Sequence, residues 1–436
     1  MLRYALQLAL RGFRRNAVLT GLMVLAVAMG IAAAMTMLTV LHDLAGNPLP
    51  QRSGVLFHPQ IDPRPRDLPG ARTAPPDNLT YLDALNLYHL DQVSRRALMS
   101  ANWLPLRSTV AGSPLRMETT RATTRGFFPM FDVPFQYGAP WSEQDDTRRA
   151  QVVVISQKLN DTLFGGADSV GRELIIATRL FRIVGVIKPW NPQPHFWDLD
   201  DGAYGAAAQI YLPFFTWLEL PQDYGYGPME CWGDNPGAGN HNPKGAQCTW
   251  AQYWVQLDTP AQVRAYRGLL VRYSQQQHAL GRFQRAPNVR LDDVMQWLNY
   301  KHVVPVIVRM QTWIAFGVFV ICLLNAVGLL LAKFLRRGGE IGVRRALGAR
   351  KRDVFAQCVI ESALIGLLGG VVGLPLVWLG LWLIRQQPVS YAATVQISPL
   401  LLLVALLLAA VATLLAGIWP AWRAARIEPA LVVKSL

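Results

Sequence analysis

Several side chains that could bind a metal ion lie close together in one stretch of the sequence. They are His195, Asp198, Asp200 and Asp201, with His241 further along the chain. Their spacing matches neither a zinc pattern nor a calcium-binding loop, because Gly202 stands where such a loop needs its third ligand. We therefore predict a solvated loop here and no metal site.

Sequence patterns for catalysis are otherwise missing. No Ser/His or Cys/His pair stands in a recognisable local motif, and the 436 residues contain no G-x-x-x-x-G-K-[ST] loop for nucleotide phosphates. The sequence therefore predicts a chain that is not an enzyme and that binds no cofactor itself.

One acidic residue lies well inside an apolar run. Glu361 follows Asp353 by about two helical turns and directly precedes an uncharged run. An acid at membrane depth is a candidate functional group, here with an interhelical hydrogen bond that serves coupling rather than proton transfer. The alternative, which the sequence alone favours, is a side chain near enough to the membrane surface to reach water.

The four cysteines divide between two environments. Cys231 and Cys248 lie in a Gly-, Asn- and Pro-rich stretch, and we predict that they form a disulfide in an oxidising compartment. The chain-entropy model assigns such a loop about 3 kcal/mol of stabilisation, and the alternative is two unpaired thiols. Cys322 and Cys358 fall in or beside apolar runs, where unreactive buried thiols are expected.

Four uncharged apolar runs must position these groups. They cover residues 17–41, 310–332, 362–384 and 399–422. At 1.5 Å per residue each is about 34–38 Å long, enough to cross a hydrocarbon core of about 30 Å. A signal peptide is the alternative for the first run, but its apolar stretch is too long for a typical signal core.

The net charge of +14 comes mostly from basic residues in the short segments beside the apolar runs. This distribution is typical of a membrane protein and not of a nucleic-acid-binding surface. The segments before the first run, between the second and third, and after the fourth contain 15 basic and 3 acidic residues, whereas residues 42–309 contain 26 basic and 24 acidic ones. Short loops rich in Lys and Arg mark the cytoplasmic side. We therefore predict cytoplasmic termini, an extracytoplasmic domain between the first two spans, and no nucleic-acid partner.

Small residues recur at helical spacing in two of the spans. They are Ala26, Gly30 and Ala34 in the first span, and Gly366, Gly369, Gly370 and Gly373 in the third. This spacing lets two helix backbones approach closely. Because four spans make a thin bundle, these stripes suggest contact with a partner chain.

The large domain has the pattern of an α+β fold. Strands are predicted near residues 54–57 and over 151–155, 181–187 and 253–257. A short helix over 158–164 is followed by two glycines, and Thr259-Pro260-Ala261-Gln262 predicts a capping box that opens a helix to about residue 277. From Leu291 the pattern turns helical and predicts a nearly continuous helix into the second span.

The predicted fold is therefore a membrane protein with four transmembrane α-helices and a large extracytoplasmic α+β domain of two subdomains. The predicted segments are an amphipathic helix (1–16), the spans (17–41, 303–333, 354–384 and 399–422), the large domain (42–302), a cytoplasmic coupling segment (334–353), a short loop (385–398) and a cytoplasmic tail (423–436).

The segment between the second and third spans is densely basic. Residues 338–354 read GGEIGVRRALGARKRDV, which predicts a short helix over 340–347 that Gly348 ends. Val343, Ala346 and Leu347 share a narrow face, with Arg344 and Arg345 on others, as in a helix that docks into a groove of a partner. Charge alone favours the alternative of a basic loop that contacts lipid headgroups.

Three blocks of the chain resemble a known family. EIGVRRALGARKRDV followed by ESALIGLLGGVVGLPLVWL, and the ending IWPAWRAARIEPALVV, resemble the FtsX-like permease domain of MacB-type ABC transporters of the mechanotransmission class. VVVISQKLNDTLFGGADSVGRELIIATRLFRIVGVI resembles the periplasmic core of that family. With four spans and one large outer loop, the resemblance covers nearly the whole chain.

The resemblance implies a permease of the bacterial inner membrane that binds no nucleotide itself. Two copies of a separate ATPase, which hold ATP and Mg²⁺, would dock on two permease chains, which form either a homodimer or a heterodimer of paralogues. The docking segment would be Glu340, Ile341, Gly342, Val343, Arg344, Arg345, Ala346, Leu347, Gly348 and Ala349. It further implies export of a drug, peptide or lipid-like molecule, often with a periplasmic adaptor and an outer-membrane channel.

Two features depart from the family pattern. Gly339 replaces the basic residue that usually precedes Glu340, which puts in doubt the start of the docking helix. The aromatic-rich stretch from about residue 189 to 250 is unusually long, and forms either a recognition surface or the core of an insertion. Alternative functions are lipoprotein release or cell-division signalling within the family, or an anchored receptor without an ATPase.

Overall fold

The computed structural model describes residues 17–68, 73–90, 93, 95–109, 112–200, 202–221, 226–232, 244–245, 247–389, 391–392 and 399–426. The chain divides into two compact units. We call residues 17–45 and 304–426 the helical unit and residues 46–303 the α/β unit. The predicted helix over 1–16, half of the loop 385–398 and the tail after Arg426 lie outside the described residues, as do Asp201 and His241.

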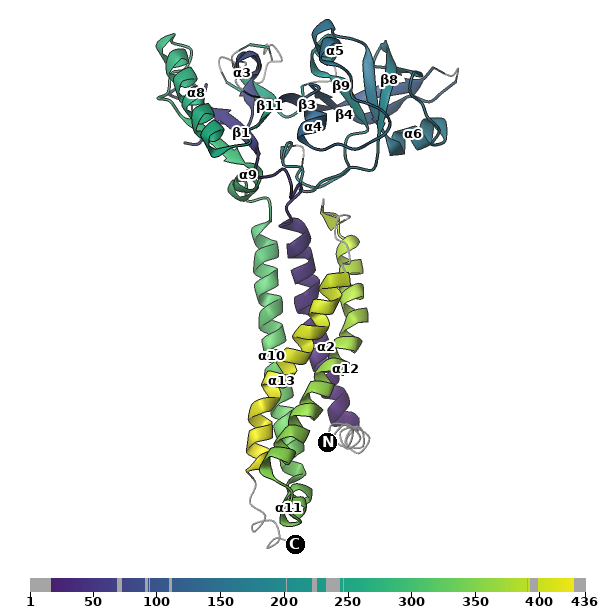
Figure 1. Ribbon diagram of the computed structural model, residues 1–436, viewed down its shortest axis with the longest axis vertical. Coiled ribbons are helices and arrows are strands. Elements are labelled where there is room, and N and C mark those ends of the chain that lie inside the picture. Colours follow the sequence, from purple (N-terminus) through teal and green to yellow (C-terminus); the bar gives the residue numbers. More distant parts are fainter. Residues whose placement is uncertain are drawn as a thin grey trace. The chain divides into compact units, whose positions relative to one another are not determined.

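Four long helices form the helical unit (Figure 1). They are α2 (Ala17–Leu44), α10 (Val306–Arg336), α12 (Lys351–Arg385) and α13 (Pro399–Ala425). All four are long and apolar enough to cross a membrane. A short helix, α11 (Gly338–Ala346), follows α10 at one end of the bundle (Figure 1). Three of the long helices extend three or four residues beyond the uncharged runs from which they were predicted, whereas α12 begins eleven residues before its run.

Glycines allow the long helices to pack at backbone distance. A Cβ added to Gly366 would lie 1.7 Å from Thr413 Oγ1 of α13, and one added to Gly369 would lie 2.7 Å from Val27 Cγ1 of α2. At Gly30, an added Cβ would lie 2.9 Å from Cys322 Cβ of α10. Gly370 and Gly373 likewise face α13 and α2, and Ala34 is buried while Ala26 is partly buried. The interpretation that these stripes point to a partner chain is therefore wrong, because helices of the same chain fill them.

The predicted, nearly continuous helix from Leu291 into the second span is also wrong. Residues Val289–Asp293 form strand β12, and α9 (Val294–Tyr300) ends five residues before α10 begins. Between them His302 has a positive φ of 49° and Pro305 caps α10. Since Pro305 has no N–H to donate, a helix cannot run through this position with its hydrogen bonds intact.

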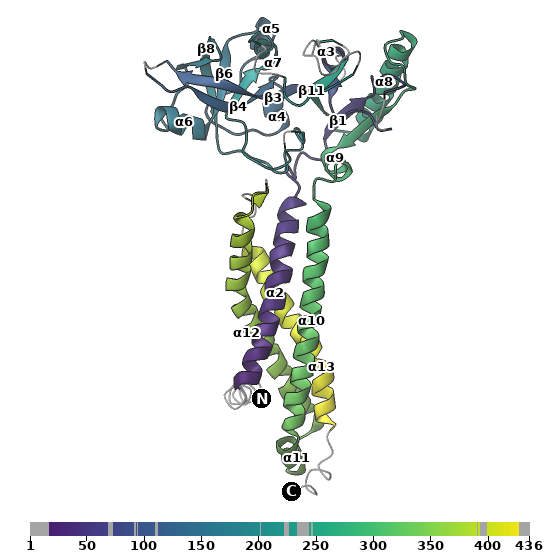
Figure 2. The same cartoon turned by 180° about the vertical axis from the view of Figure 1, so that it is seen from behind.

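One sheet extends through the α/β unit (Figure 2). Its strands are β1 (Leu56–Ile61), β2 (Leu79–Thr80), β3 (Arg95–Ser108), β4 (Arg116–Thr123), β5 (Phe135–Gly138), β6 (Val152–Ser156), β7 (Glu173–Ile176), β8 (Arg179–Ile187), β9 (Ile210–Pro213), β10 (Glu230–Cys231), β11 (Cys248–Gln256) and β12. The main order is β12-β1-β11-β3-β4-β9-β6-β8-β5. The β4–β9 and β6–β8 pairs are parallel. The two predicted subdomains therefore share a single sheet.

Both faces of this sheet are covered. Along β6, Val153 and Ile155 enter one hydrophobic cluster and Val152 and Val154 the other, because successive side chains point to opposite faces. The first face packs against α3 (Tyr81–His89), α6 (Gln157–Phe164), α7 (Phe214–Trp217) and α8 (Pro260–Ala279). The second packs against α4 (Phe127–Met130), α9 and the loop that follows Trp190.

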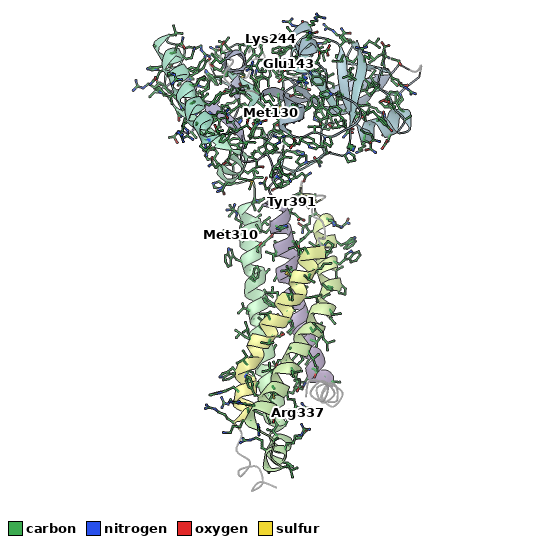
Figure 3. All side chains as sticks on the ribbon, viewed as in Figure 1. Met130, Glu143, Lys244, Met310, Arg337 and Tyr391 are labelled. Carbon is green, nitrogen blue, oxygen red and sulfur yellow. A yellow bond between two sulfur atoms is a disulfide. The ribbon has the colours of Figure 1, made fainter. Side chains whose placement is uncertain are left out.

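Local signals account for several element boundaries. Helix α6 ends at Gly165, which has φ +64°, where the sequence predicts its stop. Helix α8 begins with the predicted capping box of Thr259 and Gln262, with Pro260 at the first helical position. Strand β11 starts at Cys248, five residues before its predicted start. Helix α5 (Glu143–Arg148) has a capping box of its own; its first residue is labelled in Figure 3.

Candidate functional site

Helix α11 is the short element predicted between the second and third spans. It begins at Gly338, one residue after the end-cap of α10, and Gly348 follows its C-terminus with φ +103°. Glu340 lies in its first turn, and the Glu340 carboxylate pairs with Arg344 at 2.6 Å. The helix therefore forms although Gly339 stands where the family carries a basic residue.

The apolar and basic residues of α11 have different surroundings. Leu347 is 83% exposed and Val343 46%, and Ala346 is exposed as well. Arg344 Nη1 lies 3.4 Å from Gln357 Oε1 of α12, and Arg345 Nη1 lies 3.4 Å from the carbonyl oxygen of Ala425 at the end of α13. The arginines therefore attach α11 to the bundle, while the narrow apolar face predicted from the sequence stays open.

A buried ionic cluster lies where α11 joins the bundle. Lys333 Nζ is 2.6 Å from Glu361 Oε1, and Arg337 Nη1 is 3.2 Å from Glu361 Oε2. Lys333 also donates a hydrogen bond of 3.1 Å to Thr20 Oγ1. We call these four residues the ionic joint, because they link α2, α10 and α12; Arg337, labelled in Figure 3, caps both α10 and α11.

The joint corrects the interpretation that Glu361 reaches water. Glu361 is 1% exposed and Lys333 is fully buried. Removing one partner of a buried ion pair leaves an uncompensated charge and costs about 3–5 kcal/mol. The joint is therefore a strong constraint on the relative positions of α10 and α12 at the start of α11.

Sequence reasoning found Glu361 but missed Lys333. Lys333 directly follows the uncharged run of the second span, so its position suits a side chain that reaches the membrane surface. The matching depths of Lys333 and Glu361 in neighbouring spans could have suggested a pair, but no local pattern shows which helices are neighbours.

The candidate metal-binding side chains have separate partners. His195 and Asp198 are buried and not solvated as predicted, whereas Asp200 is exposed. Asp198 is buried and pairs with Arg121 at 2.5 Å. His195 Nε2 is hydrogen-bonded to Asn191 Oδ1 at 2.8 Å, and Asp200 accepts a hydrogen bond of 2.9 Å from Asn78. Among the residues the structure describes, no group of three metal-binding side chains forms.

Most of the aromatic-rich stretch belongs to the hydrophobic core. Trp217 and Trp250 of this stretch are almost completely buried, in agreement with the insertion-core alternative. Cys231 and Cys248 form the predicted disulfide and pair β10 with β11. Trp190 is only partly buried and lines a cavity of the α/β unit.

Comparison with known families gives two matches that together cover most of the chain. Residues 20–272 match the MacB-like periplasmic core domain, and residues 312–429 match the FtsX-like permease C-terminal domain.

Curated relatives are similar along almost all of this chain. It is 24% identical to a macrolide export ATP-binding/permease protein MacB of Azoarcus and 25% identical to one of Wolinella succinogenes, over 99% of this chain in each case. It is also 24% identical, again over 99% of this chain, to a pyoverdine export ATP-binding/permease protein PvdT of Pseudomonas fluorescens. The chain spans about 60% of the length of these relatives (59%, 60% and 59%).

Solved structures with similarity include the periplasmic region of MacB from Actinobacillus actinomycetemcomitans, with 14% identity and a TM-score of 0.36 over 56% of this chain and 92% of that one. The extracellular domain of the noncanonical ABC-type transporter YknZ from Gram-positive bacteria has 16% identity and a TM-score of 0.34, over 54% of this chain and 99% of that domain.

Four membrane-length helices and a periplasmic core domain make this an inner-membrane protein with a periplasmic domain. Because the periplasmic core model alone covers more than half of the chain and the permease model covers the C-terminal helices, the chain belongs to the MacB/FtsX-type family of ABC transporter permeases.

Proposed function

We propose that this chain is a non-catalytic permease subunit that transmits ATP-driven movement from a separate ABC ATPase to its periplasmic domain. ATP and Mg²⁺ are bound by the ATPase, of which two copies serve two permease chains. The termini and α11 lie in the cytoplasm, as the positive-inside distribution of charge indicates. Export of a small molecule with a periplasmic adaptor and an outer-membrane channel is the favoured use, because relatives carry export names.

The observation that carries this proposal is the division of α11 into two faces. Leu347 and Val343 present an apolar surface on a helix whose arginines are engaged with α12 and α13. Exposed apolar side chains next to charged ones are typical of a surface that a partner covers. A lipid-contacting basic loop, the alternative from charge alone, would instead direct its arginines outward.

Two ion pairs connect the start of α11 directly to the membrane-spanning helices, so a movement of α11 can be transmitted to them. Arg337 joins α11 to Glu361 of α12, and Lys333 joins the same carboxylate to α10. A push on α11 therefore acts on two spans through one buried carboxylate. This supports coupling through the bundle rather than a substrate path between the four helices.

Co-purification from native membranes tests the proposal. The wild-type chain should retain an ABC ATPase, and Leu347→Asp should release it because a carboxylate would be buried in the apolar contact. Leu280→Asp is the matched control, since Leu280 is 70% exposed in the α/β unit. An ATPase that stays bound to Leu347→Asp would show that it does not dock on the apolar face of α11. No ATPase on the wild type would favour the anchored-receptor alternative.

A further inference from the structure

The α/β unit contains a cavity of about 240 Å³ with several aromatic side chains in its walls. It lies on the sheet face that α4 covers, between β3, β4 and the loop that follows Trp190. The aromatic side chains that line it are Phe127, Trp190, Trp197, Tyr204 and Tyr211, with Trp103 exposed at β3. Trp190 and Trp197 stack on each other, with ring centroids 5.2 Å apart and an interplanar angle of 18°. The walls are therefore flat rings held in place before any ligand arrives.

Two buried charged side chains line the same cavity. Arg121 Nη2 lies 2.5 Å from Asp198 Oδ2, and their side chains are 8% and 2% exposed. Gln252 accepts a hydrogen bond of 2.7 Å from Arg121 and donates one of 2.6 Å to Asp198. The three side chains thus form a closed ring of hydrogen bonds in which each terminal guanidinium nitrogen has one partner.

Arg121 has more donors than this ring uses. A guanidinium carries five N–H groups, and the ring takes two of them. Within the described parts of the chain, Arg121 makes no other hydrogen bond. Because Arg121 lines the cavity and these N–H groups can donate further hydrogen bonds, an acceptor atom of a ligand inside the cavity would be stabilised there.

The charge of the cavity wall selects an uncharged ligand. Asp198 compensates the charge of Arg121. Burial, and to a smaller degree the nearby Arg121, lowers the pKa of His195 to about 4, so this imidazole is neutral at pH 7. A carboxylate or ammonium group in the cavity would therefore lose its hydration without gaining a counter-ion.

The size of the cavity selects a single ring. Sites that enclose drug-sized ligands have about 300–1,000 Å³, so 240 Å³ takes a small molecule or one end of a larger one. The side chains of residues 205–208, which also line the cavity, are small and leave room for a flat ligand.

We propose that this cavity binds an uncharged aromatic ring that carries a carbonyl oxygen, with the ring against the Trp190–Trp197 wall and the oxygen accepting a hydrogen bond from Arg121. This binding needs no ATPase and no second chain. It is therefore independent of the proposed function, and either can fail without the other.

The test is a fluorine NMR titration of the full chain in lipid nanodiscs, with empty nanodiscs subtracted. The probe is 4-fluoroacetophenone. Two analogues each lack one feature: 1-ethyl-4-fluorobenzene has no acceptor oxygen, and 1-(4-fluorocyclohexyl)ethanone has no flat ring. The probe should bind saturably. The analogue without oxygen should bind about ten- to a hundredfold more weakly, and the analogue without the flat ring about two- to tenfold more weakly.

Variants assign the binding to this cavity. Ala207→Phe fills the cavity and should abolish saturable binding, and Trp190→Ala removes one wall and should weaken binding about two- to tenfold. Trp190 is only partly buried, so this variant should fold; Trp313→Ala, at an exposed tryptophan of α10, is the matched control and should bind like wild type. Equal binding of the three probes, no saturable binding, or wild-type affinity in both cavity variants would overturn the proposal.

Discussion

Lys333 of α10 and Glu361 of α12 form an ion pair of 2.6 Å in which both side chains are almost completely buried. The pair lies at the end of the bundle where α11 begins, and Arg337 shares the same carboxylate. The pair therefore fixes α10 against α12 beside the start of α11.

We expect Glu361→Gln to destabilise the helical unit by about 3–5 kcal/mol, because it leaves the buried Lys333 without its carboxylate partner. Lys333→Met should cost less, because Arg337 still pairs with Glu361. The double variant Lys333→Met with Glu361→Met should lose much less than the sum. Thermal unfolding followed by a thiol-reactive dye at Cys322 and Cys358 measures this, since both thiols lie in the helical unit. Glu340→Gln, which breaks the partly exposed pair with Arg344, should cost only about 0–1 kcal/mol. Additive losses in the double variant would contradict the pairing.

The arginines of α11 should act as anchors rather than as docking residues. Arg344→Ala and Arg345→Ala remove the contacts to Gln357 and Ala425, so amide hydrogen exchange in α11 should become several-fold faster in the isolated chain. Arg336→Ala changes an exposed arginine of α10 and serves as the control. Unchanged exchange in both α11 variants would show that other contacts hold this helix.

Close helix packing predicts a sharp difference between two glycines. Gly366→Ala places a methyl group against Thr413 and the carbonyl oxygen of Ala409, and it should cost about 1–3 kcal/mol through displacement of α13. Gly328→Ala, in α10, meets open space and should leave stability unchanged or raise it by up to about 1 kcal/mol. Equal melting temperatures of the two variants would argue against the α12–α13 contact.

The disulfide should stabilise the α/β unit. Cys231→Ser with Cys248→Ser opens a loop of sequence separation 17, and we expect a loss of about 3 kcal/mol in the chain-entropy model. Tryptophan fluorescence during thermal unfolding monitors this unit, which contains the core residues Trp217, Trp250 and Trp254. Cys322→Ser, in the helical unit, should not change the melting temperature of the α/β unit. A double variant that melts like wild type would mean that the strand pairing alone holds this region.

Acid should destabilise the α/β unit through His195. Burial lowers the pKa of His195 from 6.5 to about 4, so between these values the unfolded chain binds a proton that the folded chain does not. This contribution to stability is complete above pH 6.5 and is lost as the pH falls towards 4, by at most about 3 kcal/mol. His195→Gln should flatten the pH profile of unfolding, whereas His89→Gln, at an exposed position, should not. Burial also lowers the pKa of His58, so part of the acid sensitivity should remain in the His195 variant.

Much of the architecture follows from local patterns in the sequence. The four spans are evident from uncharged runs, because hydrocarbon excludes charge along a continuous stretch. The start of α8 and the ends of α6 and α11 are evident from Thr259, Gly165 and Gly348, because capping depends on residues only a few positions apart. The apolar face of α11 is evident from spacing alone.

Tertiary structure decided what depends on contacts between distant residues. The partner of Glu361 is 28 positions away in another helix, and Asp198 is buried by pairing with Arg121, 77 positions earlier. Neither pairing produces a periodic pattern in the sequence. The sequence alone therefore favoured contact with water for both Glu361 and Asp198. The break before α10 and the filling of the glycine stripes also depend on which elements pack together, and burial and charge pairing are properties of that packing rather than of any local stretch.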